Sequence, residues 1–187
     1  MMVMVSGILM PIKQVRLVAS KVQAAIEVPY SQQHIALGSK RSGRHRSIQY
    51  IVIHNTANSQ STAQNEVDYL SNVNNTSSTA FHMAVDDEEI IEVISPTEIA
   101  YHAGDGNGDG NHYGIGIEIC ESGDFTKATV NAAKLVAYLM KTYDIPLNHV
   151  KTHHDFSGKN CPRLMLEDWD SFLEEVKDAY EALDENR

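Results

Sequence analysis

The stretch that decides the fold is YIVIH at residues 50–54. It is a short, continuous apolar run that ends in a histidine. Runs of this length are typical of strands buried on both faces near the middle of a sheet. We therefore expect a central strand here. Its last residue, His54, is expected where the sheet meets the loops that commonly carry functional residues.

Strand patterns continue after this run. Residues 79–85 (TAFHMAV) and 89–94 (EIIEVI) are separated by an acidic turn and are typical of a strand pair. In IGIEI at 115–119, isoleucines alternate with a glycine and a glutamate. This alternation predicts a strand with Glu118 on the face opposite the isoleucines.

Three segments have helical features. STAQ at 61–64 has the spacing of a capping box, and the apolar residues after it predict a helix near 62–73. Apolar residues also recur at helical intervals over 129–143 and 166–183. Strands interleaved with helices predict an α/β fold, with a central mixed β-sheet flanked by helices in a single domain.

The 187-residue chain fits one domain with an arm. Residues 1–48 are weakly patterned, and KRSGRHRS at 40–47 is polar and basic, so we expect an N-terminal arm or extension, exposed at 40–47, before a catalytic domain at 49–187. The apolar start, MMVMVSGILM, has no basic residue ahead of it, which disfavours a signal peptide. No apolar run reaches the roughly 20 residues that span a bilayer.

The net charge of the chain limits the classes of binding partner that we expect. The chain has 15 Lys and Arg against 25 Asp and Glu, for a formal net charge of -10. Nucleic acids and anionic membranes call for a basic surface, so neither is expected as a partner. The two cysteines, Cys120 and Cys161, lie in different contexts, an apolar strand and a polar loop, and are expected to be reduced.

The densest group of potential metal ligands is THHDFSGKNCP at 152–162. Imidazole and thiolate are preferred zinc ligands, and three protein ligands plus a water are typical of a catalytic zinc site. Together with His54, this segment could form such a site. The alternative is that His54 is a hydrogen-bonded structural residue and Cys161 a small buried apolar one. Residue type and spacing alone leave both interpretations open.

The order of the motifs resembles that of the zinc N-acetylmuramoyl-L-alanine amidases, a family that includes phage-lysozyme-type amidases, peptidoglycan recognition proteins and prophage endolysins. The resemblance spans about Tyr50 to Leu166 and is greatest to endolysin and autolysin amidase domains of Gram-positive bacteria and their phages. It rests on IVIHNT at 51–56, FHMAVD at 81–86, YHAG at 101–104, IGIEI at 115–119, and THHD to KNCP at 152–162.

The resemblance implies a Zn²⁺ cofactor and roles for particular residues. The zinc ligands would be His54, His153 and Cys161, with His153 chosen over His154 because it lies two residues before the aspartate. Glu118 matches a catalytic glutamate. Lys159 matches a lysine that stabilises the oxyanion in some members.

Four more residues are expected near the site. Asp155 could orient a ligand histidine, as carboxylates next to metal ligands do. His82 and His102 are candidates for the cleft lining, with a hydrogen-bonded structural role as the alternative for each. Phe81 stands where some members have a tyrosine, and because a phenyl ring cannot relay a proton, the acid–base role is assigned to Glu118.

The reaction implied is hydrolysis of the amide bond between N-acetylmuramic acid and L-alanine in peptidoglycan, as in an endolysin, prophage lysin or autolysin. The chain would be made in the cytoplasm and reach the cell wall through lysis or another route. The alternatives are a muropeptide-recycling amidase, a non-catalytic peptidoglycan-binding module and a zinc peptidase of the stem peptide. A glycine-rich loop, DGNGDG at 105–110, imitates a calcium loop but has Gly116 at the twelfth position, where that motif needs glutamate.

Overall fold

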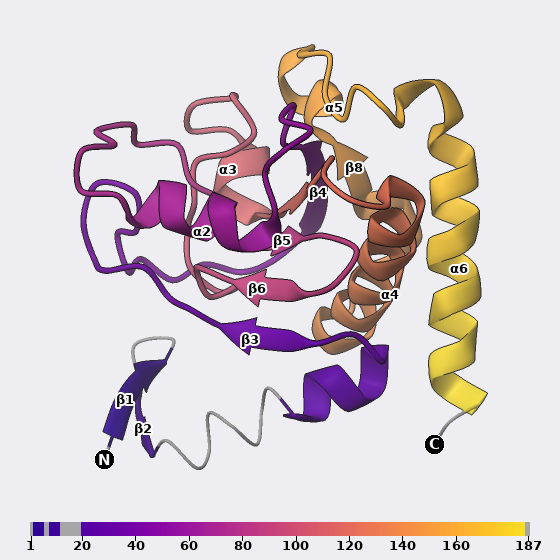
Figure 1. The fold of residues 1–187 in the computed structure, drawn as a ribbon, viewed down its shortest axis with the longest axis horizontal. Coiled ribbons are helices and arrows are strands. Elements are labelled where there is room, and N and C mark those ends of the chain that lie inside the picture. Colours follow the sequence, from indigo (N-terminus) through magenta and orange to yellow (C-terminus); the bar gives the residue numbers. More distant parts are fainter. Residues whose placement is uncertain (1, 6–7, 12–19, 186–187) are drawn as a thin grey trace.

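A mixed six-stranded sheet forms the centre of the computed structural model, which describes residues 2–5, 8–11 and 20–185 (Figure 1). The strand order is β3 (Tyr30–Gln32), β6 (Ile90–Glu92), β5 (Met83–Val85), β7 (Gly114–Ile119), β4 (Tyr50–Asn55) and β8 (Val150–Thr152). Strands β5 and β6 are antiparallel, and all other neighbours are parallel. The predicted α/β fold with a mixed sheet is confirmed.

The YIVIH run is the inner strand β4, which lies between β7 and β8. Ile51, Val52 and Ile53 are fully buried. A strand with a neighbour on each side and cover on both faces needs apolar residues at successive positions, because neither face reaches water. The continuous apolar run therefore follows from the position of β4 in the sheet.

One face of the sheet packs against two long helices, α4 (Phe125–Tyr143) and α6 (Trp169–Glu185), which lie side by side (Figure 1). The isoleucines of β7 belong to this core. The predicted helices at 129–143 and 166–183 both form. Helix α4 begins four residues before its predicted start because the Asp124 side chain accepts a hydrogen bond from the Lys127 N–H and caps the helix.

The opposite face is covered over β5 and β6 by α2 (Ala63–Ser71), whose Val67 and Leu70 pack with Ala84 and Ile91. The capping box of α2 differs by one residue from the predicted pair. It is formed by Thr62 and Asn65, because the Ser61 hydroxyl instead bonds to Glu66. Over β4 and β7, this same face carries His54 and Glu118, which are directly opposite each other in the strand register.

The segment before β4 is packed against the domain. Residues 20–26 are helical, and Val22 and Ile26 belong to the core beneath α4 and α6. Strand β3 extends the sheet by pairing with β6. The apolar stretch at 1–10 lies partly outside the described residues, and within it β1 (Met2–Val5) pairs with β2 (Ile8–Pro11). The domain boundary at residue 48 stays a prediction.

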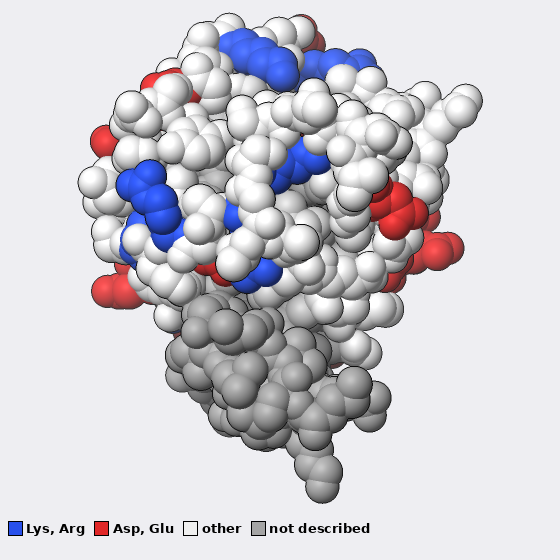
Figure 2. All heavy atoms as spheres, turned by 90° about the vertical axis from the view of Figure 1, so that its left-hand side faces the viewer, with Lys and Arg blue, Asp and Glu red and all other residues white. Residues whose placement is uncertain are grey.

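The expectation that 40–47 is exposed is wrong for three of its cations. The buried Lys40 ammonium donates to the carbonyls of Leu70 and Asn75. Arg41 forms a buried ion pair with Glu98, at 2.6 Å. Arg46 donates to two further backbone carbonyls. All three cations are thus paired with hydrogen-bond acceptors of the folded domain, as polar groups inside a protein generally are. Accordingly, Figure 2 shows basic side chains at separate places on this side of the molecule, without a continuous basic surface.

The ion pair predicts that the segment before β4 stabilises the domain. Arg41→Met leaves the Glu98 carboxylate, which is 1% exposed, without its cation. We expect the free energy of unfolding to fall by about 3–5 kcal/mol, the usual cost of breaking a buried pair. Chemical denaturation measures this. Arg44→Met, at an exposed position, is the control and should change stability by less than about 0.5 kcal/mol. Equal stability of both variants would contradict the prediction.

Candidate metal centre and its cleft

The parallel strands β4, β7 and β8 bring their carboxyl ends to one edge of the sheet. His54 lies one residue before the end of β4, and Glu118 one residue before the end of β7. His153 follows β8 directly. Binding sites in open α/β sheets form at this edge, because the loops that leave the strands converge there.

His153 is positioned by the start of a short helix, α5 (His153–Ser157). The Asp155 carboxylate accepts hydrogen bonds from the Thr152 N–H at 2.7 Å and from the Thr152 hydroxyl at 2.8 Å. The Thr152 hydroxyl oxygen accepts in turn from the Asp155 N–H. The Asp155 carboxylate thus bonds to Thr152 and supports His153 through the backbone of α5. That it also orients a ligand histidine stays a prediction.

Cys161 reaches the same place through a tight return of the chain. Gly158 ends α5 in the left-handed conformation, with φ of 73°, which glycine adopts without strain. The chain then folds back, so that the His154 N–H donates to the Cys161 carbonyl at 2.9 Å. The backbone of Asn55 forms a hydrogen bond to the Cys161 thiol. These bonds hold Cys161 against the end of β4.

His54, His153 and Cys161 form a buried group whose potential ligand atoms all lie within 4.8 Å of one another. The two Nδ1 atoms are 3.0 Å apart, and the sulfur is 3.8 Å from His54 Nδ1. Tetrahedral zinc with its usual bond lengths requires about 3.3 Å between two nitrogens and about 3.6 Å between nitrogen and sulfur. A single metal ion fits this group with small adjustments, and a fourth coordination position remains for water or substrate.

Burial sets the protonation of these ligands. It lowers the pKa of His54 well below its usual range and, reinforced by Lys159, lowers that of His153 to about 4. Both imidazoles are therefore neutral at pH 7, with a lone pair available. Burial also raises the pKa of the Cys161 thiol to about 11. Metal binding must displace the thiol proton, which makes affinity depend on pH.

Glu118 and Lys159 line the cleft beside this group. Burial, with a smaller contribution from Glu66, raises the pKa of Glu118 to about 8. Its Oε2 atom is buried and has no hydrogen-bond partner among the described residues. A carboxyl group that titrates near neutral pH can both accept and release a proton during turnover.

The two histidines that were candidates for the cleft lining, His82 and His102, lie in different surroundings. His102 lines the cleft and lies against His54. His82 is fully buried behind it, where Nδ1 accepts from the Gly116 N–H and Nε2 donates to the Glu98 carbonyl. The position of His82 therefore matches a hydrogen-bonded structural residue, which was the alternative to a residue that lines the cleft. Phe81 is also buried, in the core beneath α2.

The cleft has a volume of about 370 Å³ and includes residues to which the sequence had assigned no role of their own. These are Asn55, Thr79, Tyr101, Gly104, Asn111 and Ser157. The Asn111 side-chain oxygen accepts from the N–H groups of both His102 and Ala103, at 2.7 Å each. In the glycine-rich loop, the Asp105 carboxylate accepts from two backbone N–H groups at the start of α3 (Asp109–Tyr113), so it caps that helix.

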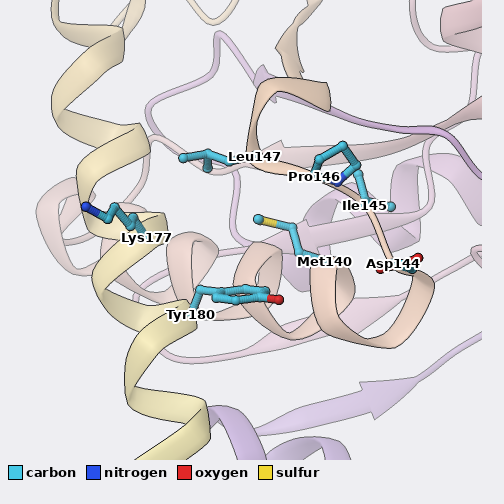
Figure 3. Close-up of a pocket in the computed structure, with 7 residues that line it drawn as sticks. All are labelled: Met140, Asp144, Ile145, Pro146, Leu147, Lys177 and Tyr180. Carbon is cyan, nitrogen blue, oxygen red and sulfur yellow. The ribbon is translucent and has the colours of Figure 1, made fainter.

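A larger hollow of about 510 Å³ lies between α4, the loop after it, and α6 (Figure 3). It is lined by Met140, Asp144, Ile145, Pro146, Leu147, Lys177 and Tyr180. These side chains are mostly apolar and include neither histidine nor cysteine. The histidine-lined cleft is therefore the candidate functional site, although it is the smaller of the two.

Comparison with known proteins identifies the family. The sequence profile described as N-acetylmuramoyl-L-alanine amidase matches residues 44–164. The chain belongs to this family. The amidase domain is 46% identical over 146 residues to the N-acetylmuramoyl-L-alanine amidase XlyA of Bacillus subtilis (strain 168), covering 75% of this chain and 48% of that protein. CwlH of the same organism is 46% identical over 133 residues, covering 70% and 53%.

A solved structure of the catalytic domain of XlyA has the same fold. It superposes with a TM-score of 0.77 at 44% identity, covering 80% of this chain and 99% of that chain. The amidase domain spans about half the length of the curated relatives it matches. The comparisons therefore show the family and the fold of this chain.

Cysteine substitutions test the metal centre. Cys161→Ala removes the sulfur from the ligand group, so we expect the amidase domain to lose most of its bound metal. Cys120→Ala is the matched control, because this second buried thiol belongs to the core beneath α2. Elemental analysis after zinc loading and gel filtration should show about one metal ion per chain for the control. Full occupancy of Cys161→Ala would refute the ligand assignment.

The pKa of Glu118 predicts how stability depends on pH in the metal-free domain. Between the usual value of 4.5 and the folded value of about 8, the folded state keeps a proton that the unfolded state has released. The free energy of unfolding should therefore fall with rising pH over this window, relative to Glu118→Gln, by up to about 1.4 kcal/mol per pH unit. Denaturation with chelator present measures this, and parallel pH profiles for the two proteins would contradict it.

Proposed function

We propose that this domain hydrolyses the amide bond between N-acetylmuramic acid and L-alanine in peptidoglycan, using zinc held by His54, His153 and Cys161. The observation that carries the proposal is the convergence of these ligands with Glu118 and Lys159 in one cleft. Membership in the amidase family supplies the bond that is cleaved, because a site of this type does not by itself fix a substrate.

Zinc is the metal that best suits the donors. Two imidazole nitrogens and one thiolate match its preferences, and three protein ligands are typical of catalytic rather than structural sites. When bound, zinc supplies a nucleophilic water of lowered pKa and polarises the scissile carbonyl. The surrounding protein must then move protons and stabilise charge.

Glu118 is the proposed general base and acid. Its unpartnered Oε2 can accept a proton from the attacking water and pass it to the nitrogen of the departing L-alanine. The raised pKa of the metal-free site favours uptake of this proton, and a bound zinc cation would lower the pKa and so restore the carboxylate that acts as the base. Phe81 cannot share this role, since it has no hydroxyl and lies in the core.

Lys159 is the proposed electrostatic stabiliser. Its positive charge acts on both ligand histidines and on Glu118, and its side chain lines the cleft. An ammonium group placed here would stabilise negative charge that develops on the carbonyl oxygen. The same charge opposes the rise in the pKa of Glu118 and keeps its carboxylate form accessible.

The proposed place of action is the cell wall, in the manner of an endolysin or autolysin. Within the described residues, no helix has both the length and the apolar character needed to cross a membrane. The enzyme would reach its substrate after cell lysis or by a separate secretion route. A muropeptide-recycling amidase is the alternative role, and it would act on soluble fragments in preference to intact walls.

Products distinguish the proposed reaction from its rivals. Mass spectrometry of digested walls should show intact stem peptides beginning with L-alanine, separated from the glycan strands. Cuts within the stem peptide would indicate a peptidase. Binding to walls without release of L-alanine amino termini would indicate a non-catalytic module.

The role of Glu118 predicts a separation of metal binding from turnover. Glu118→Gln keeps the size of the side chain and every metal ligand, so zinc content should be unchanged. Because the amide cannot take up the proton, the rate of amide hydrolysis should fall at least about 100-fold. Glu167→Gln, at an exposed position, is the control and should retain full activity. Retained activity of Glu118→Gln would rule out the general-base role.

A further inference from the structure

His102 and His54 form a short chain of hydrogen bonds that starts at the backbone of β7. His102 Nε2 lies 3.0 Å from the Gly114 carbonyl oxygen. His102 Nδ1 lies 3.1 Å from Nε2 of His54. The other nitrogen of His54, Nδ1, faces His153 and Cys161. The ring that would bind the metal is therefore held from behind by another imidazole.

The carbonyl at the start of this chain fixes the direction of every bond in it. A carbonyl oxygen only accepts, so His102 Nε2 must carry a proton. In a neutral ring this makes Nδ1 of His102 an acceptor, and the proton shared with His54 then belongs to His54 Nε2. A neutral His54 protonated at Nε2 has an unprotonated Nδ1, which is the form that binds a metal.

The reverse direction is unfavourable. If His102 donated from Nδ1 as well, it would be a doubly protonated cation at a position only 5% exposed to solvent. The Arg46 guanidinium donates to the same Gly114 carbonyl, at 2.8 Å, and would repel a cationic His102. Burying an unpaired charge beside another cation costs far more than one hydrogen bond returns.

The fold provides a fitted place for the His102 ring. A Cβ added at Gly116 would lie 2.6 Å from Cγ of His102, so the ring occupies the space that any side chain at 116 would fill. Asn111 fixes the backbone on the other side by accepting from the N–H groups of His102 and Ala103. The backbone of Ala103 in turn forms a hydrogen bond to His153. One segment, 102–103, therefore supports both ligand histidines.

We infer that His102 is a positioning residue that holds His54 in the tautomer with Nε2 protonated and Nδ1 directed, unprotonated, at the metal. This rests on the proposed zinc site and assigns His102 the supporting role that the sequence suggested for Asp155. It also explains the glycine in the IGIEI strand, because the face that carries Glu118 must leave room at 116 for an imidazole.

The tautomer can be observed without metal or turnover. Nitrogen-15 NMR of the metal-free domain distinguishes protonated from unprotonated ring nitrogens, and comparison with His54→Gln assigns the His54 signals. We expect His54 to be protonated at Nε2 alone at neutral pH. A proton on Nδ1 of His54 in the wild-type domain would overturn the inference, whatever the variants do.

Substitutions at 102 and 116 test the cause. His102→Leu should let both tautomers of His54 appear and should weaken zinc binding about 10–100-fold in chelator competition, the usual effect of losing such a partner. His102→Asn, whose side-chain oxygen can accept from His54, should recover part of this affinity. Gly116→Ala should displace the ring and weaken binding without removing the imidazole. His45→Leu, at an exposed histidine, should change neither quantity.

Each result has a defined meaning. Unchanged zinc affinity and an unchanged tautomer in folded His102→Leu would overturn the inference. If His102→Leu does not fold, the inference is tested by the tautomer of His54 in the wild-type domain and by the zinc affinity of Gly116→Ala. Failure of zinc-loaded wild-type protein to release L-alanine amino termini, with the tautomer as expected, would instead contradict the proposed function and leave the role of His102 intact.

Discussion

The parallel pairing of β4 with β7 on one side and β8 on the other is the constraint on which the site depends. It places the ends of three strands at one edge, so His54, Glu118 and His153 meet although they are far apart in the sequence. The apolar residues of these strands hold the pairing in place from the opposite face, where α4 and α6 cover them. The core and the site are thus two faces of the same strands.

Local turns, helix caps and backbone hydrogen bonds then bring the side chains of the site close to one another. The Thr152–Asp155 capping box starts α5 at His153, and the left-handed Gly158 turns the chain so that Cys161 comes back to the end of β4. On the other side of the cleft, Asn111 and the Gly114 carbonyl fix the segment that bears His102. Most of these contacts are hydrogen bonds to the backbone. They fix the main chain on both sides of His153, Cys161 and His102, and so give these side chains defined positions in the buried cleft.

Burial gives the site its electrostatic character. The imidazoles are kept neutral, and the pKa of Glu118 is raised to about 8. Two cations of the 40–47 segment, which the sequence predicted to be exposed, instead pack against the domain. Arg41 neutralises Glu98, and Arg46 bonds to the backbone beside His82. The segment before β4 therefore contributes to the support behind the histidines, through contacts that its weak pattern did not reveal.

The sequence alone determined the elements with strong periodicity and the buried central strand, because periodicity is a local property. It also indicated side chains that could hold a metal, but the choice of His54, His153 and Cys161 came from the family resemblance. The sequence placed Glu118 on the face opposite the isoleucines, since side chains alternate along a strand. Only the tertiary structure decided that Asp155 caps a helix, that His102 contacts His54, and that Arg41 is buried. These depend on which segments meet across the fold, and a hydrogen-bonding side chain accepts many partners until packing leaves one within reach.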